Sequence, residues 1–292
     1  MNYQSNKSNQ SNKSNQLNNF NHRALTITFG ECAENHKGMQ MIGHIANNGF
    51  SIADLNRAKE YFEANYNCQT ELIDLKQKLL DSEQDSDTES DTVLDPTLID
   101  PASVLIIHNG INAILSEFGA DTDLLYEELI NLDYDTKAFM YGRVVNKSAR
   151  YNLCFSDHNQ EPSYEDKKGR IVSYNDLDYL PIIRHTLPEI IGDTGYDLQA
   201  EANYYFDTRK TGIGFHGDSE RKKVIALRLG ETIPLHYQWF YKSEPVGPRI
   251  ILNNIKHGSI YIMSEKATGY DWKKKNTYTL RHAAGSAKYT TI

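Results

Sequence analysis

The order of polar and apolar residues divides the chain into a polar start, a helical stretch and a long series of strands. Residues 1–22 repeat Ser-Asn-Lys and Ser-Asn-Gln units with almost no apolar side chains, so burial cannot offset the entropy of ordering them. We predict a disordered tail there. An apolar run at Leu25–Phe29 follows, and helical spacing extends from Ser51 through Leu80, with Asp54 completing an imperfect capping box.

Short segments with strand-like alternation dominate the rest of the chain. Only Asp121–Leu132 and Pro181–Ile191 have helical spacing there. The predicted strands are Ser103–His108, Ala138–Val145, Arg150–Phe155, Ala202–Phe206, Lys223–Leu229, Leu235–Tyr241, Arg249–Leu252, Ser259–Met263 and Thr277–Leu280. Because no regular alternation of strand and helix occurs, an antiparallel barrel or jelly roll within an α+β fold is favoured over a Rossmann-type sheet.

Charge is distributed unevenly along the 292 residues. Residues 1–140 contain 9 Lys and Arg against 22 Asp and Glu, whereas residues 141–292 contain 22 against 17. The segment 81–101 is an acidic loop in our interpretation, and the mildly basic C-terminal half is compatible with a polyanionic substrate. Neither an apolar stretch long enough to span a membrane nor a signal-like N-terminus occurs, so we expect an intracellular protein, cytoplasmic or nuclear, without a membrane partner.

The candidate chemistry lies in the segment Gly212–Glu220. His216 and Asp218 are two residues apart, which places both side chains on one face of an extended strand end. An imidazole and a carboxylate, joined by a second histidine from elsewhere in the chain, form the facial triad of non-haem Fe(II) oxygenases. This triad leaves coordination positions for a 2-oxo acid and O2. The His-x-Asp pair alone is a weak signal, and its position between two predicted strands strengthens it.

The chain resembles the AlkB-like branch of the 2-oxoglutarate/Fe(II) dioxygenases over residues 138–292. The resemblance rests on Asn203-Tyr204-Tyr205 before the His-x-Asp pair, on Leu229-Gly230 after it, and on the strand entry His257-Gly258-Ser259. It implies a double-stranded β-helix (jelly-roll) core with flanking helices, preceded by a partly helical N-terminal region at residues 23–137 to which it assigns no chemistry. It also implies that Asn203 and Tyr205 bind 2-oxoglutarate.

Two positions in this comparison have competing candidates. His282 and His257 compete for the distal metal ligand, and the family pattern favours His282 because the ligand follows the 259–263 strand. The family also has an arginine beyond the distal histidine that pairs with the far carboxylate of the keto acid, and this chain has none there. Lys288 or Arg228 could replace it, and the sequence weakly favours Lys288.

The resemblance extends to a substrate-binding element upstream of the core. Residues 147–153 are similar to the family's lid, and Tyr141, Arg150 and Tyr151 are the candidates for contacting a flipped or single-stranded base. Ordinary packing of a flanking strand is the competing interpretation. The triplets Arg221-Lys222-Lys223 and Lys273-Lys274-Lys275 could steer phosphates, or they could be solvated turns.

The resulting hypothesis is an enzyme that demethylates or hydroxylates a nucleobase in nucleic acid, an activity typical of DNA repair, with Fe(II), 2-oxoglutarate and O2. A protein or small-molecule hydroxylase on the same core is the alternative, since a fold and a metal site do not fix the substrate. A third interpretation is a jelly-roll binding module whose His-x-Asp pair is accidental. The oligomeric state is left open.

Overall fold

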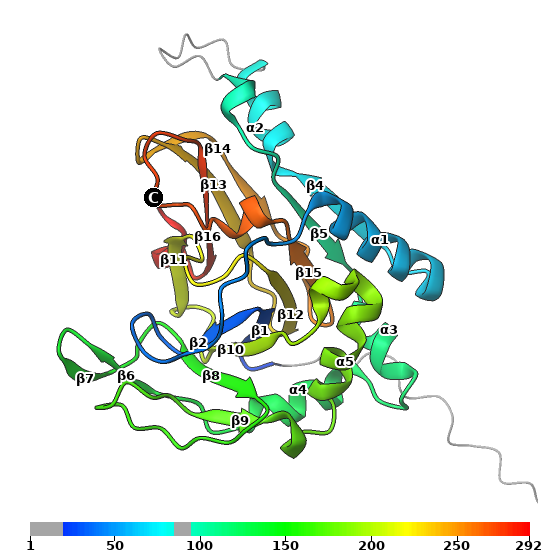
Figure 1. Ribbon diagram of the computed structural model, residues 1–292, viewed down its shortest axis with the longest axis vertical. Coiled ribbons are helices and arrows are strands. Elements are labelled where there is room, and N and C mark those ends of the chain that lie inside the picture. Colours follow the sequence, from blue (N-terminus) through cyan, green and yellow to red (C-terminus); the bar gives the residue numbers. More distant parts are fainter. Residues whose placement is uncertain (1–19, 85–94) are drawn as a thin grey trace, which may run out of the picture.

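The structure is a computed structural model that describes residues 20–84 and 95–292. Almost all of the predicted tail and residues 85–94 of the predicted acidic loop lie outside these ranges. The described residues form a mixed α+β fold dominated by strands (Figure 1). No helix within them is long and apolar enough to cross a membrane.

The larger of two main sheets has eight strands in the order β4-β5-β15-β12-β1-β10-β8-β9. Its strands are β1 (Ala24–Gly30), β4 (Thr70–Asp74), β5 (Ser103–Ile107), β8 (Tyr151–Ser156), β9 (Ile171–Ser173), β10 (Gln199–Tyr205), β12 (Val224–Gly230) and β15 (Ile260–Met263). All neighbours are antiparallel except β8 and β9. Strands from both of the predicted regions, 23–137 and 138–292, therefore share this sheet.

The smaller sheet has four strands in the order β11-β16-β13-β14. These are β11 (Gly212–His216), β13 (Leu235–Tyr241), β14 (Glu244–Leu252) and β16 (Thr279–Gly285). Two hairpins complete the strands: β2 (Cys32–Glu34) with β3 (Met41–Gly43), and β6 (Lys137–Met140) with β7 (Arg143–Asn146).

Helices cover the outer face of the larger sheet. They are α1 (Ile52–Tyr66), α3 (Gly110–Ser116), α4 (Thr122–Ile130) and α5 (Leu180–Ile191), while α2 (Leu75–Gln84) packs near β14 and α6 (Ala287–Thr290) lies near the C-terminus. Figure 1 shows α1, α3 and α5 on one side of this sheet and the smaller sheet on the other. Every second residue of β1, Leu25, Ile27 and Phe29, is buried in the core beneath these helices.

A second core fills the space between the two sheets. It combines Val224 and Ala226 of the larger sheet with Tyr237, Trp239 and Leu280 of the smaller one. The two faces of the larger sheet thus have different partners: one packs on helices, and the other faces the smaller sheet.

Most predicted elements are present. The helix predicted at Pro181–Ile191 and the strand at Leu235–Tyr241 match α5 and β13 closely, and Ser51 caps α1 in a capping box with Asp54. Some predictions were wrong in detail, and residues 81–84 of the predicted acidic loop belong to the end of α2. The helical stretch through Leu80 is interrupted by β4, which pairs with β5, and the predicted strand Ala138–Val145 is the β6–β7 hairpin.

Candidate metal centre

A cavity of about 170 Å³ lies between the two sheets. Its floor consists of alternate residues on neighbouring strands of the larger sheet, and its roof comes from β11, β13 and β16. The floor residues are Thr26, Thr28, Glu201, Asn203, Tyr205, Val224, Arg228, Tyr261 and Met263. The residues between them in the sequence point to the opposite face and into the helix-covered core. Because side chains alternate between the two faces of a strand, the larger sheet has a polar cavity on one face and an apolar core on the other.

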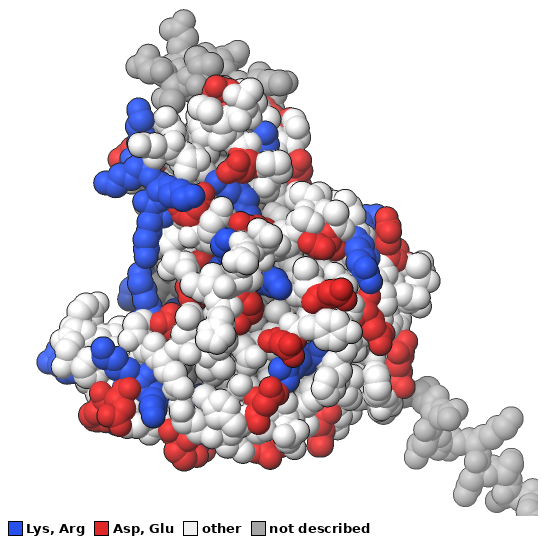
Figure 2. Space-filling view, viewed as in Figure 1, with Lys and Arg blue, Asp and Glu red and all other residues white. Residues whose placement is uncertain are grey.

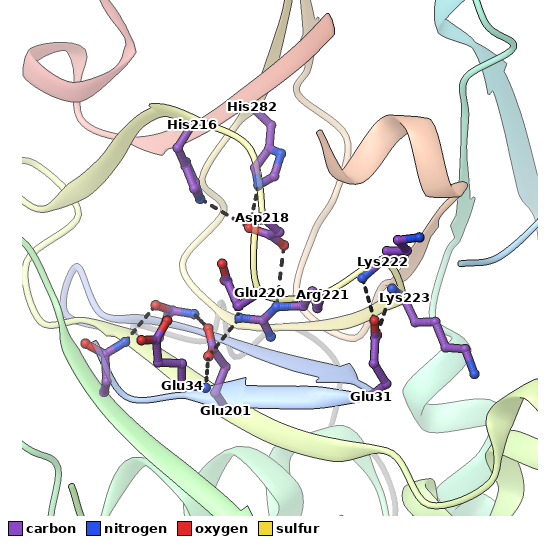
Figure 3. Close-up of polar contacts among 12 residues, drawn as sticks. Glu31, Glu34, Glu201, His216, Asp218, Glu220, Arg221, Lys222, Lys223 and His282 are labelled. Atoms are coloured by element: carbon purple, nitrogen blue, oxygen red, sulfur yellow. Dashed lines mark hydrogen bonds and ion pairs between the residues drawn. The ribbon is translucent and has the colours of Figure 1, made fainter. Parts of the chain in front are cut away.

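His216, Asp218 and His282 meet in the roof of this cavity. The ligand atoms of the three residues all lie within 4.8 Å of one another. Asp218 Oδ1 is 3.5 Å from His216 Nε2 and 3.6 Å from His282 Nε2. His216 and His282 are register partners on β11 and β16, so a single cross-strand pair supplies both imidazoles (Figure 3).

The loop from Glu265 to Trp272 holds the segment between the two ligands in place. The carbonyl oxygen of Thr268 accepts a 2.9 Å hydrogen bond from the Asp218 backbone N–H. A Cβ atom at Gly217 would lie 2.0 Å from the Gly269 carbonyl oxygen and 2.6 Å from Trp272 Cδ1. Only glycine fits between His216 and Asp218, because the loop packs directly against the backbone there.

The protonation states of the triad suit metal binding. His216 Nδ1 is 2.8 Å from the carbonyl oxygen of Gly214, which only accepts, so Nδ1 donates to it and Nε2 is the ring atom left to face Asp218 and a metal ion. Burial lowers the pKa of His282 to about 3 and keeps the ring neutral. Burial alone would raise the pKa of Asp218, but its hydrogen bond with His216 and the charge of Arg221 outweigh this and hold it well below its usual range. Two neutral imidazoles and one carboxylate form a donor set that fits a divalent transition metal ion.

Arg221 is a buried residue of the site whose position the sequence did not predict. Its Nη2 lies 2.9 Å from Glu201 Oε2 and 3.1 Å from Glu220 Oε1, and its Nε lies 3.6 Å from Asp218 Oδ2. Figure 3 shows the guanidinium between these carboxylates, below the triad. The guanidinium thus faces the Asp218 oxygen that points away from the histidines.

The structure does not favour phosphate steering by the 221–223 triplet. Arg221 is only 3% exposed and is paired with carboxylates. Lys222 Nζ donates to the Asn47 carbonyl oxygen and Lys223 Nζ to that of Thr194, while both backbone N–H groups donate to Glu31. Internal contacts therefore occupy these cations. Lys273, Lys274 and Lys275 are exposed.

The candidate keto-acid residues divide into two groups. Asn203, Tyr205 and Arg228 line the cavity, whereas Lys288 lies exposed on α6 and is not among the lining residues. Among the described residues, Nε and Nη1 of the buried Arg228 have no hydrogen-bond partner, and neither has the hydroxyl of Thr26, its register neighbour on β1. Of these two cations only Arg228 lines the cavity, so the geometry favours Arg228 over Lys288.

The three candidate substrate residues also lie in different places. Arg150 lines the cavity, and its Nε donates a 2.5 Å hydrogen bond to Asn203 Oδ1. Tyr151 stacks on Phe206 with ring centroids 4.4 Å apart and does not line the cavity. Tyr141 is 93% exposed in the β6–β7 turn. Of the three, only Arg150 lines the cavity that contains the triad.

His257 is a structural residue. Its Nδ1 accepts a 2.8 Å hydrogen bond from the Gly230 backbone N–H, and its ring stacks on Phe20. The choice of His282 over His257 therefore agrees with the geometry.

The N-terminal region supplies part of the cavity wall that sequence reasoning missed. Glu34, Asn35, His36 and Lys37, at the end of β2 and in the turn after it, all line the cavity. Asn35 is fixed by Asp135, which accepts from its side-chain amide, and by Lys147 Nζ, which donates to Asn35 Oδ1 at 2.7 Å. No sequence motif marks this turn, since its place depends on contacts with residues far along the chain.

One comparison with known proteins identifies a relative of the whole chain. Over 265 residues the chain is 47% identical to "Uncharacterized protein R156" of Acanthamoeba polyphaga mimivirus, a match that covers 91% of this chain and 96% of the viral protein. The chain belongs to the family of this viral protein. A match of this length cannot fit within residues 138–292, so the N-terminal region is part of what the R156 family shares. No model of a known protein family matches the chain.

Proposed function

We propose that the chain is an Fe(II)- and 2-oxoglutarate-dependent dioxygenase of the AlkB-like branch, with the two facing sheets as its double-stranded β-helix. The observation that carries the proposal is the convergence of His216, Asp218 and His282 in a cavity that also contains the unpartnered donors of Arg228. A metal-binding triad beside a buried guanidinium suits a cosubstrate that has both a chelating end and a free carboxylate.

Each residue has a defined task in this proposal. His216, Asp218 and His282 hold Fe(II), which with 2-oxoglutarate and O2 supplies oxidation of a substrate C–H bond coupled to decarboxylation of the keto acid. Arg228 binds the far carboxylate, and the cavity-lining hydroxyls of Thr26, Tyr205 and Tyr261 are available beside it.

The proposed substrate is a methyl-bearing nucleobase in nucleic acid. A cavity of about 170 Å³ leaves room for a small cosubstrate and a protruding group but not for a large molecule. Arg150, at the cavity wall, is the candidate for contacting the base. A methyl group at the edge of a flipped or single-stranded base is a protruding group of this kind.

Succinate production tests the activity. With Fe(II), 2-oxoglutarate and methylated single-stranded oligonucleotides, we expect turnover in the parent protein and none in His216→Ala or Asp218→Ala. His185→Ala is the matched control, because His185 is exposed on α5. Persistent turnover in both triad variants contradicts the metal centre, whereas stimulation by peptides and not by oligonucleotides moves the substrate to the protein class.

The keto-acid site is tested in the same assay. Arg228→Ala should raise the KM for 2-oxoglutarate by about 10–100-fold, the effect of losing a charged hydrogen bond. Lys288→Ala should leave it unchanged, because Lys288 lies outside the cavity. The reverse order would return the carboxylate site to Lys288.

A further inference from the structure

Trp272 lies at the mouth of the cavity and is surrounded by cations. It lines the cavity beside Gly217, and the charged groups of Arg281, Lys273 and Lys37 lie 5.3, 5.7 and 5.9 Å from its ring centroid. These cations come from β16, from the loop before it and from the β2–β3 turn. Segments far apart in the sequence thus place positive charge around one aromatic ring.

The same pattern continues on the outer side of the smaller sheet. Phe215 and Arg281 directly precede the metal ligands His216 and His282, so the alternation of each strand turns them away from the cavity. The Arg281 guanidinium lies 3.8 Å from the Phe240 ring centroid, and that of Arg249 lies 5.6 Å from Phe215. Among the described residues, Arg281 Nε has no hydrogen-bond partner.

Arg249, Trp272 and Arg281 belong to a segment of the chain with an excess of positive charge. Residues 231–292 contain nine Lys and Arg against four Asp and Glu. Asp271, one of the four, is buried and paired with Lys266 at 2.9 Å. Figure 2 shows Lys and Arg side chains gathered along the edge formed by β11, β16 and the β13–β14 end.

We propose that Trp272, Arg281, Phe215 and Arg249 form a binding surface for a single strand of nucleic acid, which leads to the mouth of the cavity. Aromatic faces stack with bases of any sequence, and cations between them pair with phosphates. An acidic peptide would pair with the cations alone and has no flat groups for the aromatic rings. The use of this surface in catalysis rests on the proposed function, but binding itself does not.

Binding of a fluorescently labelled single strand of about 12 nucleotides tests the surface, a length within the range of single-strand sites. We expect Arg249→Ala/Arg281→Ala to weaken binding at least about tenfold, and to reduce the slope of log affinity against log salt by about 1.4 if each arginine contacts one phosphate. Lys59→Ala/Lys256→Ala removes the same charge from positions elsewhere, half-buried on α1 and exposed after β14, and should keep the parent affinity.

A second measurement guards against misfolding of the arginine variant. Trp239 is fully buried, so quenching of tryptophan fluorescence by the strand should come from Trp272 and disappear in Trp272→Phe. Equal weakening in both double variants, no quenching, or equally tight binding of poly-glutamate would overturn the proposal. A parent protein that binds the strand but shows no turnover with Fe(II) and 2-oxoglutarate contradicts the proposed activity and leaves the surface standing.

Discussion

At the residue scale, the charge of Arg221 acts on the carboxylate of the proposed metal site. It is the cation closest to the outward oxygen of Asp218, and it also offsets Glu201 and Glu220. We expect Arg221→Met to weaken Mn(II) binding measured by calorimetry, because Asp218 would lose its orientation, and Arg221→Lys to restore part of it. Removing one partner of a buried ion pair should also lower the free energy of unfolding by about 3–5 kcal/mol.

The matched control is Arg209→Met. Arg209 pairs with Asp207 at 2.9 Å, but its side chain is 67% exposed, and exposed pairs contribute only about 0–1 kcal/mol. Unfolding by urea distinguishes the two variants. If they lose the same stability and Arg221→Met keeps the parent metal affinity, then Arg221 does not position Asp218.

The predictability of the site differs from residue to residue. His216 and Asp218 could be singled out from their spacing and their place between two predicted strands, because side chains two residues apart on a strand end share a face. For the far carboxylate of the keto acid, Arg228 could be named only as an alternative to Lys288, since the sequence does not tell which of the two cations points inward. Glu34 and Arg221 could not be assigned, because their surroundings depend on contacts such as that between Glu34 N and Glu201 Oε2, across 167 residues.

At the element scale, the β2–β3 hairpin carries a carboxyl group that titrates unusually. Burial raises the pKa of Glu34 to about 7, with Glu220 and Glu201 adding to the shift, while the Gly38 N–H and Arg221 oppose it. The folded protein therefore binds a proton that the unfolded chain releases between about pH 4.5 and 7. The extra proton stabilises the folded state, so it adds to the free energy of unfolding at acidic pH. This addition is lost as the pH rises through 7.

Glu34→Gln removes this titration. The variant should gain stability relative to the parent as the pH increases from 5 to 8, which thermal unfolding across about four pH values in this range would measure. Glu60→Gln, an exposed substitution on α1, should run parallel to the parent. A constant difference between Glu34→Gln and the parent at all pH values would mean that the Glu34 carboxyl is ionised throughout.

Elements with strong local patterns were predictable, and those that depend on distant partners were not. Leu235–Trp239 alternates apolar and polar residue types, and Leu180–Ile191 has one apolar face, so the first pattern predicts only a strand and the second only a helix. Thr70–Asp74 lies within helical spacing, yet it forms a strand because β5 offers its edge. Tertiary pairing overrides local preference in such short segments.

At the scale of the whole molecule, the N-terminal region completes the sheet on which the cavity is built. β1 lies between β10 and β12 and is paired along its length with both, and β5 pairs with β15. Without residues 23–137, β10 and β12 would lose a shared neighbour, and the apolar faces that pack against α1, α3 and α4 would be exposed. The cavity floor would also lose Thr26 and Thr28.

We therefore expect the fragment 138–292 to lack a cooperative unfolding transition and to bind Mn(II) more weakly than the full chain, although it contains all three triad residues. Calorimetry and circular dichroism would measure both properties. Adding separately produced residues 20–137 should restore binding if the two pieces reassociate through β1. A fragment that unfolds cooperatively and binds Mn(II) like the full chain would mean that residues 138–292 form an autonomous core, with β1 as an accessory strand rather than an essential one.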